Sequence, residues 1–224
     1  MLIPRRPSSQ RDIMRERAGP RMPADTMRRS LQLCALLFAA SLAAAPALAQ
    51  RGAMTVPRNL DQLTDRASDI VRGTVVEARV EKHPELSNLD TVVVTLRVRE
   101  TLKGSAQGTY TFRQYIWDIR DRYDAAGYRK GQDVLLLMNA PSRYGLTSPA
   151  GMDQGRFRIL RDRSGREVAI NGVGNLRLFD GFDDAAKLSA PLTAKQASLV
   201  AKHRGGPIQL AELTAMIRAF AGNP

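Results

Sequence analysis

Residues 90–104 read DTVVVTLRVRETLKG, and this stretch is the clearest indication of the fold. Aliphatic side chains occupy every second position, at Val92, Val94, Leu96 and Val98. Threonine and arginine occupy most of the positions between them. A period of two is typical of a strand with one buried face. Because a Lys-Gly pair ends the stretch, we predict a long, half-buried strand that stops near residue 104.

The same alternation occurs just before this stretch. In residues 69–82, DIVRGTVVEARVEK, aliphatic and charged side chains alternate from Val76 to Glu81. Gly73 lies inside the segment, and a glycine within a strand indicates a bulge or a sharp bend. Residues 83–90, HPELSNLD, join the two stretches, so we expect an antiparallel hairpin.

Four further segments are expected to be strands. Residues 108–115 and 155–161 alternate again, whereas 133–138, DVLLLM, form a continuous apolar run. Such a run is typical of a strand that is covered on both faces, so we expect this strand at the centre of the sheet. Residues 167–171 complete a second hairpin after the turn at 162–165.

Helices are expected at both ends of the β-rich region. Residues 59–68 begin with Asn59, a residue type that favours the N-cap. Thr193 and Gln196 have the spacing of a capping box, and this helix should end near His203. A final helix would carry one apolar stripe, made of Leu210, Leu213, Ile217 and Phe220.

Short antiparallel strands followed by helices define the expected fold class. We expect a mainly β (α+β) domain, a small antiparallel β-barrel or sandwich with a short N-terminal helix and one or two C-terminal helices. Five or six strands with a bent first strand suit an OB-like, Greek-key barrel.

Residues 27–49 have the pattern of a secretory signal peptide. Arg28-Arg29 provide the positive start, a short apolar run follows, and Ala47-Leu48-Ala49 has the small residues of a cleavage site. The run is shorter than the ~20 residues that span a bilayer. We therefore expect cleavage near Gln50, a periplasmic or secreted location, and no stable membrane anchor afterwards.

The signal pattern sets the expected domain organisation. Residues 1–26 would be a mis-assigned or disordered leader, residues 50–58 a flexible start, and residues 59–224 a single β-rich domain. The only cysteine, Cys34, precedes the cleavage site. Disulfides and thiolate metal sites are therefore excluded from the exported chain.

Charge and motifs exclude several chemistries. Of the formal net charge of +12, residues 1–49 contribute +5, which leaves about +7 interspersed with acids. Nucleic-acid binding fits poorly with export, so we expect an unknown protein or an envelope polysaccharide as partner. The two histidines, His83 and His203, are expected at the surface. The sequence lacks G-x-S-x-G, H-E-x-x-H, P-loop and G-x-G-x-x-G motifs, so we expect no catalytic site, metal or cofactor.

The connection at residues 116–131 is the strongest candidate for a binding surface. It contains the only tryptophan and combines aromatic side chains with arginines, the residue types that dominate interface energetics. Long loops between strands also tend to carry function. The expected partner-binding residues are Tyr115, Trp117, Arg120, Tyr123 and Tyr128. In the alternative interpretation, Trp117 packs on the core and the loop only covers one end of the barrel.

The succession of motifs resembles a family of exported bacterial proteins of unassigned function. The likeness begins at residues 67–76, ASDIVRGTVV, and continues through Leu102-Lys103-Gly104, Gly131-Gln132 and Gln154-Gly155-Arg156-Phe157 to the terminal helix at 208–220. The resemblance implies a small OB-like Greek-key core with a C-terminal helix. It implies no particular activity.

These observations favour an exported, non-catalytic binding or envelope-associated module. One alternative is a hydrolase acting on glycans through carboxylates alone, which needs two carboxyl groups ~5 to 9.5 Å apart in a cleft. Its candidate acids are Asp118, Asp121, Asp183 and Asp184. The other alternative is a structural envelope-assembly protein that docks through the stripe of the terminal helix, which would then have to be exposed.

Overall fold

The computed structural model describes residues 55–222. The expected leader, the signal peptide and residues 50–54 lie outside this part of the chain. None of the described helices is long and apolar enough to cross a lipid bilayer. Residues 55–58 are held by Gln154, whose amide nitrogen donates to the Thr55 hydroxyl at 2.9 Å and whose amide oxygen accepts from the Arg58 N–H at 2.8 Å.

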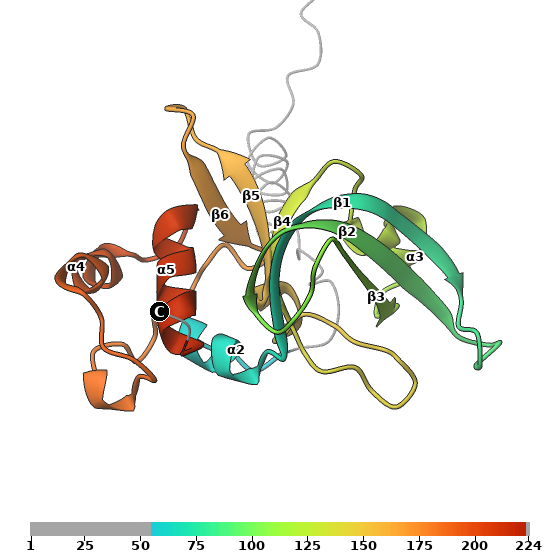
Figure 1. The fold of residues 1–224 in the computed structure, drawn as a ribbon, viewed down its shortest axis with the longest axis horizontal. Coiled ribbons are helices and arrows are strands. Elements are labelled where there is room, and N and C mark those ends of the chain that lie inside the picture. Colours follow the sequence, from blue (N-terminus) through green and yellow to red (C-terminus); the bar gives the residue numbers. More distant parts are fainter. Residues whose placement is uncertain (1–54, 223–224) are drawn as a thin grey trace, which may run out of the picture. The chain divides into compact units, whose positions relative to one another are not determined.

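Within residues 55–222, seven strands form one antiparallel sheet (Figure 1). They are β1 (Asp69–Lys82), β2 (Asp90–Lys103), β3 (Thr109–Tyr115), β4 (Asp133–Met138), β5 (Arg156–Arg161), β6 (Glu167–Asn171) and β7 (Ile208–Gln209). Six of them were predicted, and the two-residue β7 was not. The strand order is β3-β2-β1-β4-β5-β6-β7, so β4 returns to lie beside β1 in a Greek-key arrangement. The mainly β class is confirmed, and the sheet remains open rather than closing on itself.

Helices flank the sheet at both ends of the described chain, as expected. They are α2 (Leu60–Arg66), α4 (Ala194–Lys202) and α5 (Leu210–Phe220). A further short helix, α3 (Asp121–Asp124), lies between β3 and β4, where no helix was predicted. Asn59 caps α2 in a capping box with Gln62, and Thr193 does the same for α4 with Gln196. Both boxes satisfy backbone N–H groups that have no partner inside the helix. The helix starts were therefore predicted correctly from the cap residues.

β1 and β2 form a long, bent hairpin (Figure 1). The pairing register shifts between Arg72 and Gly73, and again around Val76. A Cβ atom on Gly73 would lie 2.6 Å from the carbonyl oxygen of Arg97 on β2. The bend predicted at Gly73 is confirmed, and its cause is the close approach of the two backbones.

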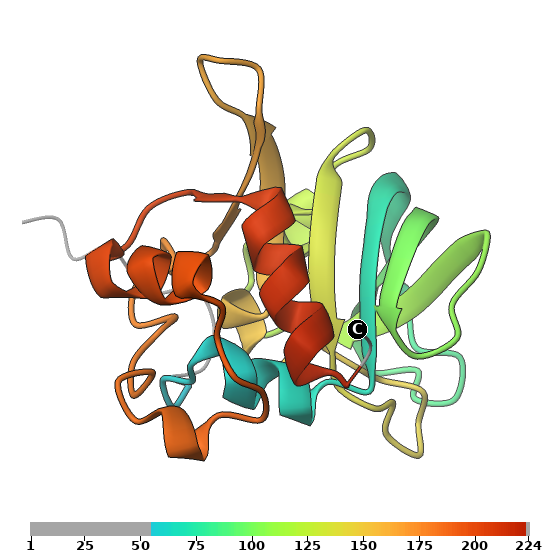
Figure 2. The same ribbon diagram turned by 60° about the vertical axis from the view of Figure 1, so that its left-hand side comes forward.

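β4 separates two apolar clusters. Leu135 and Leu137 belong to the cluster beneath α2 and α5, whereas Val134, Leu136 and Met138 belong to the cluster formed with β1, β2 and β3. This confirms that the continuous apolar run is a strand covered on both faces. The apolar stripe of α5 lies entirely in the first cluster, where each of its residues is less than 10% exposed: Leu210, Leu213, Ile217 and Phe220. An exposed stripe would have favoured the envelope-assembly alternative, but the stripe is buried in the core. Figure 2 shows α5 packed between the sheet and the other C-terminal elements.

His83 is buried, so the expectation of a surface residue was wrong. Only 2% of it is exposed. Its Nδ1 accepts hydrogen bonds from the backbone N–H groups of Glu85 and Leu86, and its Nε2 lies 2.9 Å from the carbonyl oxygen of Tyr144. Because Nδ1 accepts, the proton sits on Nε2 and is donated to Tyr144. The loop that covers His83 comes from sixty residues further along the chain, a distance over which sequence patterns carry no information.

Candidate functional site

The connection between β3 and β4 presents an exposed aromatic surface. It folds into α3 and a short 3₁₀ turn, Ala125–Gly127. Four large side chains here are at least 40% exposed: Tyr115, Trp117, Ile119 and Tyr123. Trp117 is 47% exposed and contacts Tyr115 edge-on. The three exposed aromatics among the five expected partner-binding residues are Tyr115, Trp117 and Tyr123, of which the first two are in contact. Trp117 is half-exposed rather than part of the core.

Arg120 lies on the same connection but is paired within it. Its guanidinium makes two hydrogen bonds to the carboxylate of Asp118, from Nε at 2.8 Å and from Nη2 at 2.6 Å. This hydrogen bonding raises the pKa of Arg120 above its ordinary value. The side chain is 42% exposed, so Arg120 reaches the surface as one member of an ion pair.

Tyr128 is not at the surface, contrary to its place among the expected partner-binding residues. It is 3% exposed and packs edge-on against Phe112 with ring centroids 5.6 Å apart. The Arg156 guanidinium lies over its ring, 4.9 Å from the centroid. Burial raises the pKa of Tyr128 to about 12. Its role is to form a wall beneath the aromatic surface.

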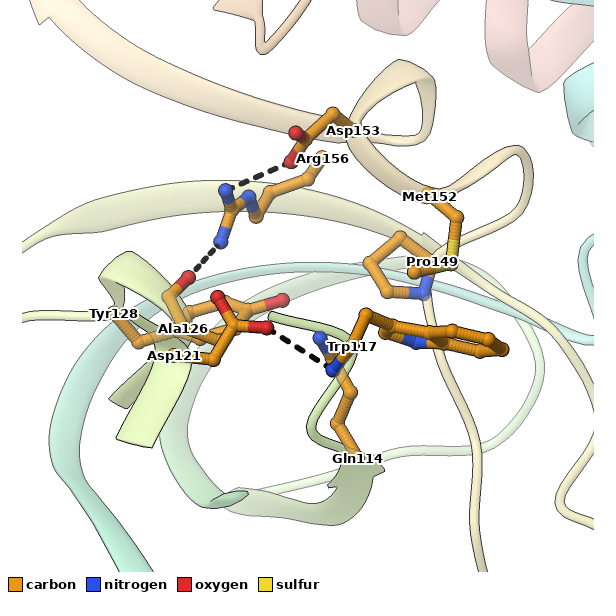
Figure 3. Close-up of a pocket in the computed structure, with 9 residues that line it drawn as sticks. All are labelled: Gln114, Trp117, Asp121, Ala126, Tyr128, Pro149, Met152, Asp153 and Arg156. Atoms are coloured by element: carbon orange, nitrogen blue, oxygen red, sulfur yellow. Dashed lines mark hydrogen bonds and ion pairs between the residues drawn. The ribbon is translucent and has the colours of Figure 1, made fainter. Parts of the chain in front are cut away.

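A small pit opens beside Trp117, with a volume of ≈ 40 Å³. Its lining comes from the β3–β4 connection and from the segment around the start of β5: Gln114, Trp117, Asp121, Ala126, Tyr128, Pro149, Met152, Asp153 and Arg156. Figure 3 shows Trp117 and Pro149 on one side of the pit and Asp121 and Arg156 on the other. Whole ligands need pockets of roughly 300–1,000 Å³, so this pit has room for a single functional group or a water.

The charged groups of the pit are held by hydrogen bonds. Asp121 accepts from the backbone N–H groups of Trp117 and Asp118, both at 3.2 Å, which fixes the start of the turn beneath the indole. Arg156 donates to Asp153 at 2.8 Å and to the carbonyl oxygen of Ala126 at 2.5 Å. These contacts join the β3–β4 connection to β5.

Two buried polar groups of the pit lack a partner within the described residues. They are the amide oxygen of Gln114, a residue that is 6% exposed, and the hydroxyl of Tyr128. An unpaired buried polar group costs ~1–3 kcal/mol. Both groups belong to residues that line the pit.

Three non-glycine residues around the pit have positive φ angles, a backbone conformation that residues with a Cβ atom rarely adopt. Ala125, Ala126 and Met152 have φ angles of 49°, 56° and 58°, in the left-handed region. This conformation costs roughly 1–2 kcal/mol for a residue with a Cβ. Such strain persists only where the surrounding structure enforces it, and it concentrates at functional sites. Ala126 and Met152 both line the pit.

The four acids of the hydrolase alternative are not gathered in one cleft. Asp121 lines the pit and Asp118 pairs with Arg120. Asp183 and Asp184 lie on the connection between β6 and α4, where Asp183 is exposed and Asp184 forms an ion pair with Lys187 at 2.7 Å. The second carboxylate of the pit is Asp153, which is paired with Arg156.

Sequence reasoning missed three polar residues of the pit, Gln114, Asp153 and Arg156, and three others that line it, Ala126, Pro149 and Met152. Arg156 did fall on the polar side of a predicted strand, and that alternation was its only signal. No family model matches this chain, and neither a curated protein nor a solved structure is significantly similar to it.

Proposed function

We propose that the protein is an exported, non-catalytic binding module that recognises polysaccharide of the cell envelope through Trp117 and the adjoining pit. The observation that carries this proposal is the juxtaposition of a half-exposed indole with a pit containing buried, unpaired hydrogen-bonding groups. A sugar ring has an apolar C–H face, which stacks on an aromatic ring, and an edge of hydroxyls. The site offers a matching surface for each.

The chemistry of the unpaired groups suits a hydroxyl. A sugar hydroxyl donates one hydrogen bond and accepts others, so it can donate to the Gln114 amide oxygen and accept from the Tyr128 hydroxyl at the same time. The volume of ≈ 40 Å³ admits a hydroxyl or hydroxymethyl group while the ring stays on the indole. Tyr115 and Tyr123 extend the aromatic surface beyond Trp117, where neighbouring sugars of a polymer would lie.

The carboxylates of the site support binding rather than hydrolysis. Asp121 is committed to two backbone N–H groups, and Asp153 is paired with Arg156. A general acid or nucleophile must instead reach the scissile bond. Carboxylates that are hydrogen-bonded in this way fix the conformation of the binding surface.

Export is supported by the signal pattern at residues 27–49. Cell fractionation followed by N-terminal sequencing tests this part of the proposal separately. The expected result is a processed chain that starts near Gln50. Recovery of an intact chain from the cytoplasm would contradict it.

Intrinsic fluorescence tests the site directly, because Trp117 is the only tryptophan. The processed protein would be titrated with soluble peptidoglycan fragments and, in parallel, with a neutral glucan. Stacking of a sugar on the indole should shift the emission to shorter wavelength and saturate with ligand. Emission that stays unchanged with every glycan would overturn the proposal and leave a protein partner as the remaining candidate.

Two variants define the binding surface. Gln114→Leu removes the unpaired acceptor and should weaken glycan binding about tenfold, the equivalent of one hydrogen bond. Tyr144→Ala is the matched control, because Tyr144 is a 38%-exposed aromatic on the connection between β4 and β5 and does not line the pit. Equal losses in the two variants would show that the effect is not specific to the pit.

A further inference from the structure

The hairpin of β5 and β6 projects from the body of the domain, and its turn points away from the other elements in both views (Figures 1 and 2). Its residues 156–167 read RFRILRDRSGRE, with five arginines and two acids, a net charge of +3. We call this segment the basic finger. Apart from Arg156, whose side chain lines the pit beside Trp117, it is a separate surface.

Both acids of the basic finger are engaged within the protein. Asp162 accepts hydrogen bonds from the N–H and hydroxyl of Ser164 and from the N–H of Arg166. Glu167 pairs with Arg72 on β1 at 2.8 Å. Their charges hold the turn and the base of the hairpin in place.

Most of the arginines point outward. Arg156 turns into the pit, but the side chains of Arg161 and Arg166 are 71% and 62% exposed. Arg158 and Arg163 are exposed as well, and neither forms an ion pair with any residue of the described chain. The finger therefore presents four exposed guanidinium groups, two of them without an ionic partner.

An apolar side chain lies among these arginines. Leu160 is 47% exposed. It shares a face of β5 with Arg158, since residues two apart in a strand point to the same side. Arg158 pairs across the hairpin with Ile170, which adds a second, partly exposed aliphatic side chain to that face. Cationic groups beside exposed aliphatic groups are the combination that binds at the surface of a lipid bilayer.

We propose that the basic finger docks on the surface of an anionic lipid bilayer. Guanidinium groups bind the phosphate groups of lipids with paired hydrogen bonds, while Leu160 enters the headgroup region. Each arginine near an anionic surface strengthens binding about fivefold, so the finger supplies reversible attachment. A soluble polyanion would use the charges but leave Leu160 in water, which is why a bilayer fits the finger better.

Vesicle sedimentation tests the proposal with the processed protein, which starts near Gln50. The vesicles would contain phosphatidylcholine with about 30% phosphatidylglycerol, compared with phosphatidylcholine alone. Binding is expected only to the anionic vesicles and should weaken as NaCl is raised, because salt screens exposed charges. The double variant Arg158→Gln/Arg163→Gln should bind about 25-fold more weakly.

The control removes the same charge elsewhere. Lys202→Gln/Arg204→Gln alters two exposed cations at the end of α4, which lies apart from the turn of the finger (Figure 1). This variant should bind at most a few-fold more weakly, as a change in net charge alone would cause. An equal loss in the two double variants would overturn the proposal, since binding would then follow net charge.

Leu160→Ser distinguishes a bilayer from a soluble polyanion. The variant should weaken vesicle binding several-fold and leave binding to dextran sulfate unchanged. If Leu160→Ser left vesicle binding unaffected and the protein bound dextran sulfate equally strongly, the finger would be a binding site for polyanions in general. That result would overturn the proposal that it docks on a bilayer. Trp117→Ala should leave vesicle binding intact, so this proposal and the glycan site can fail independently.

Discussion

The ring of Tyr115 meets the indole of Trp117 edge-on, with centroids 5.0 Å apart and ring planes inclined by 74°. Edge-to-face pairs contribute ~0.5–1.5 kcal/mol beyond the area that they bury. The hydrogen bond from the backbone N–H of Trp117 to Asp121 fixes the main chain beneath the indole, and the contact with Tyr115 orients the ring while leaving half of it exposed. A ligand therefore meets an aromatic ring that is already in place.

Truncation to alanine should have very different effects on stability at Trp117 and Tyr128, which sequence analysis had placed in the same binding surface. Trp117→Ala is expected to lower the free energy of unfolding by about 1.5 kcal/mol at most, since it loses mainly the contact with Tyr115. Tyr128→Ala should cost roughly 3–5 kcal/mol, as buried aromatic truncations do. Urea unfolding measures both values. A loss of 3 kcal/mol or more for Trp117→Ala would show that the indole belongs to the core.

His83 should exist as the neutral tautomer with its proton on Nε2. Its Nδ1 accepts from two backbone N–H groups and its Nε2 donates to Tyr144. ¹⁵N NMR of the imidazole reports the tautomer directly, and a proton on Nδ1 would contradict the structure. His83→Ala leaves these buried backbone groups without a hydrogen-bond partner and should lower the free energy of unfolding by about 1–3 kcal/mol.

Acid should loosen the turn of the basic finger. The hydrogen bond from the Ser164 hydroxyl is the main cause that lowers the pKa of Asp162 to about 2, from an ordinary 3.8. Because the folded pKa is the lower one, the ionised carboxylate stabilises the turn above pH ~4, and this contribution is lost as the pH falls through 2.

Amide exchange of Ser164 as a function of pH measures this loss, once corrected for the intrinsic exchange rate. Ser164→Ala should move the pKa of Asp162 back towards its ordinary value. An NMR titration in which Asp162 titrates at its ordinary pKa in the unaltered protein would refute the prediction.

Gly73→Ala should destabilise the domain by about 1–3 kcal/mol. The added Cβ would lie 2.6 Å from the Arg97 carbonyl oxygen, which is backbone and yields only if β2 moves. Thermal or urea unfolding measures the change. Unaltered stability would mean that the two strands do not approach each other as closely as this.

Much of the sheet could be predicted because its strands carry their own patterns. β1 and β2 match the alternating stretches at both ends, and the apolar run at 133–138 identified the strand that separates the clusters. The helix starts followed from Asn59 and Thr193, whose side chains cap the backbone locally. Each of these signals acts within a few residues.

The candidate site could be predicted only in part, because its two halves are far apart in the chain. Trp117 and Tyr123 were recognised from composition, but the pit forms where residues 114–128 meet residues 149–156. Arg156 reaches back thirty residues to Ala126. Periodicity does not indicate which loop folds over which, and for the same reason Tyr128 and His83 were expected at the surface.

The two apolar clusters share β4, so a change in the packing of one cluster also affects the other. Leu135 and Leu136 are neighbours on β4 and point into opposite clusters. A displacement of β4 that opens one cluster also withdraws side chains from the other. The Trp117 surface lies over one cluster and α5 over the other, so a change in packing beneath the terminal helix can reach the aromatic surface through β4.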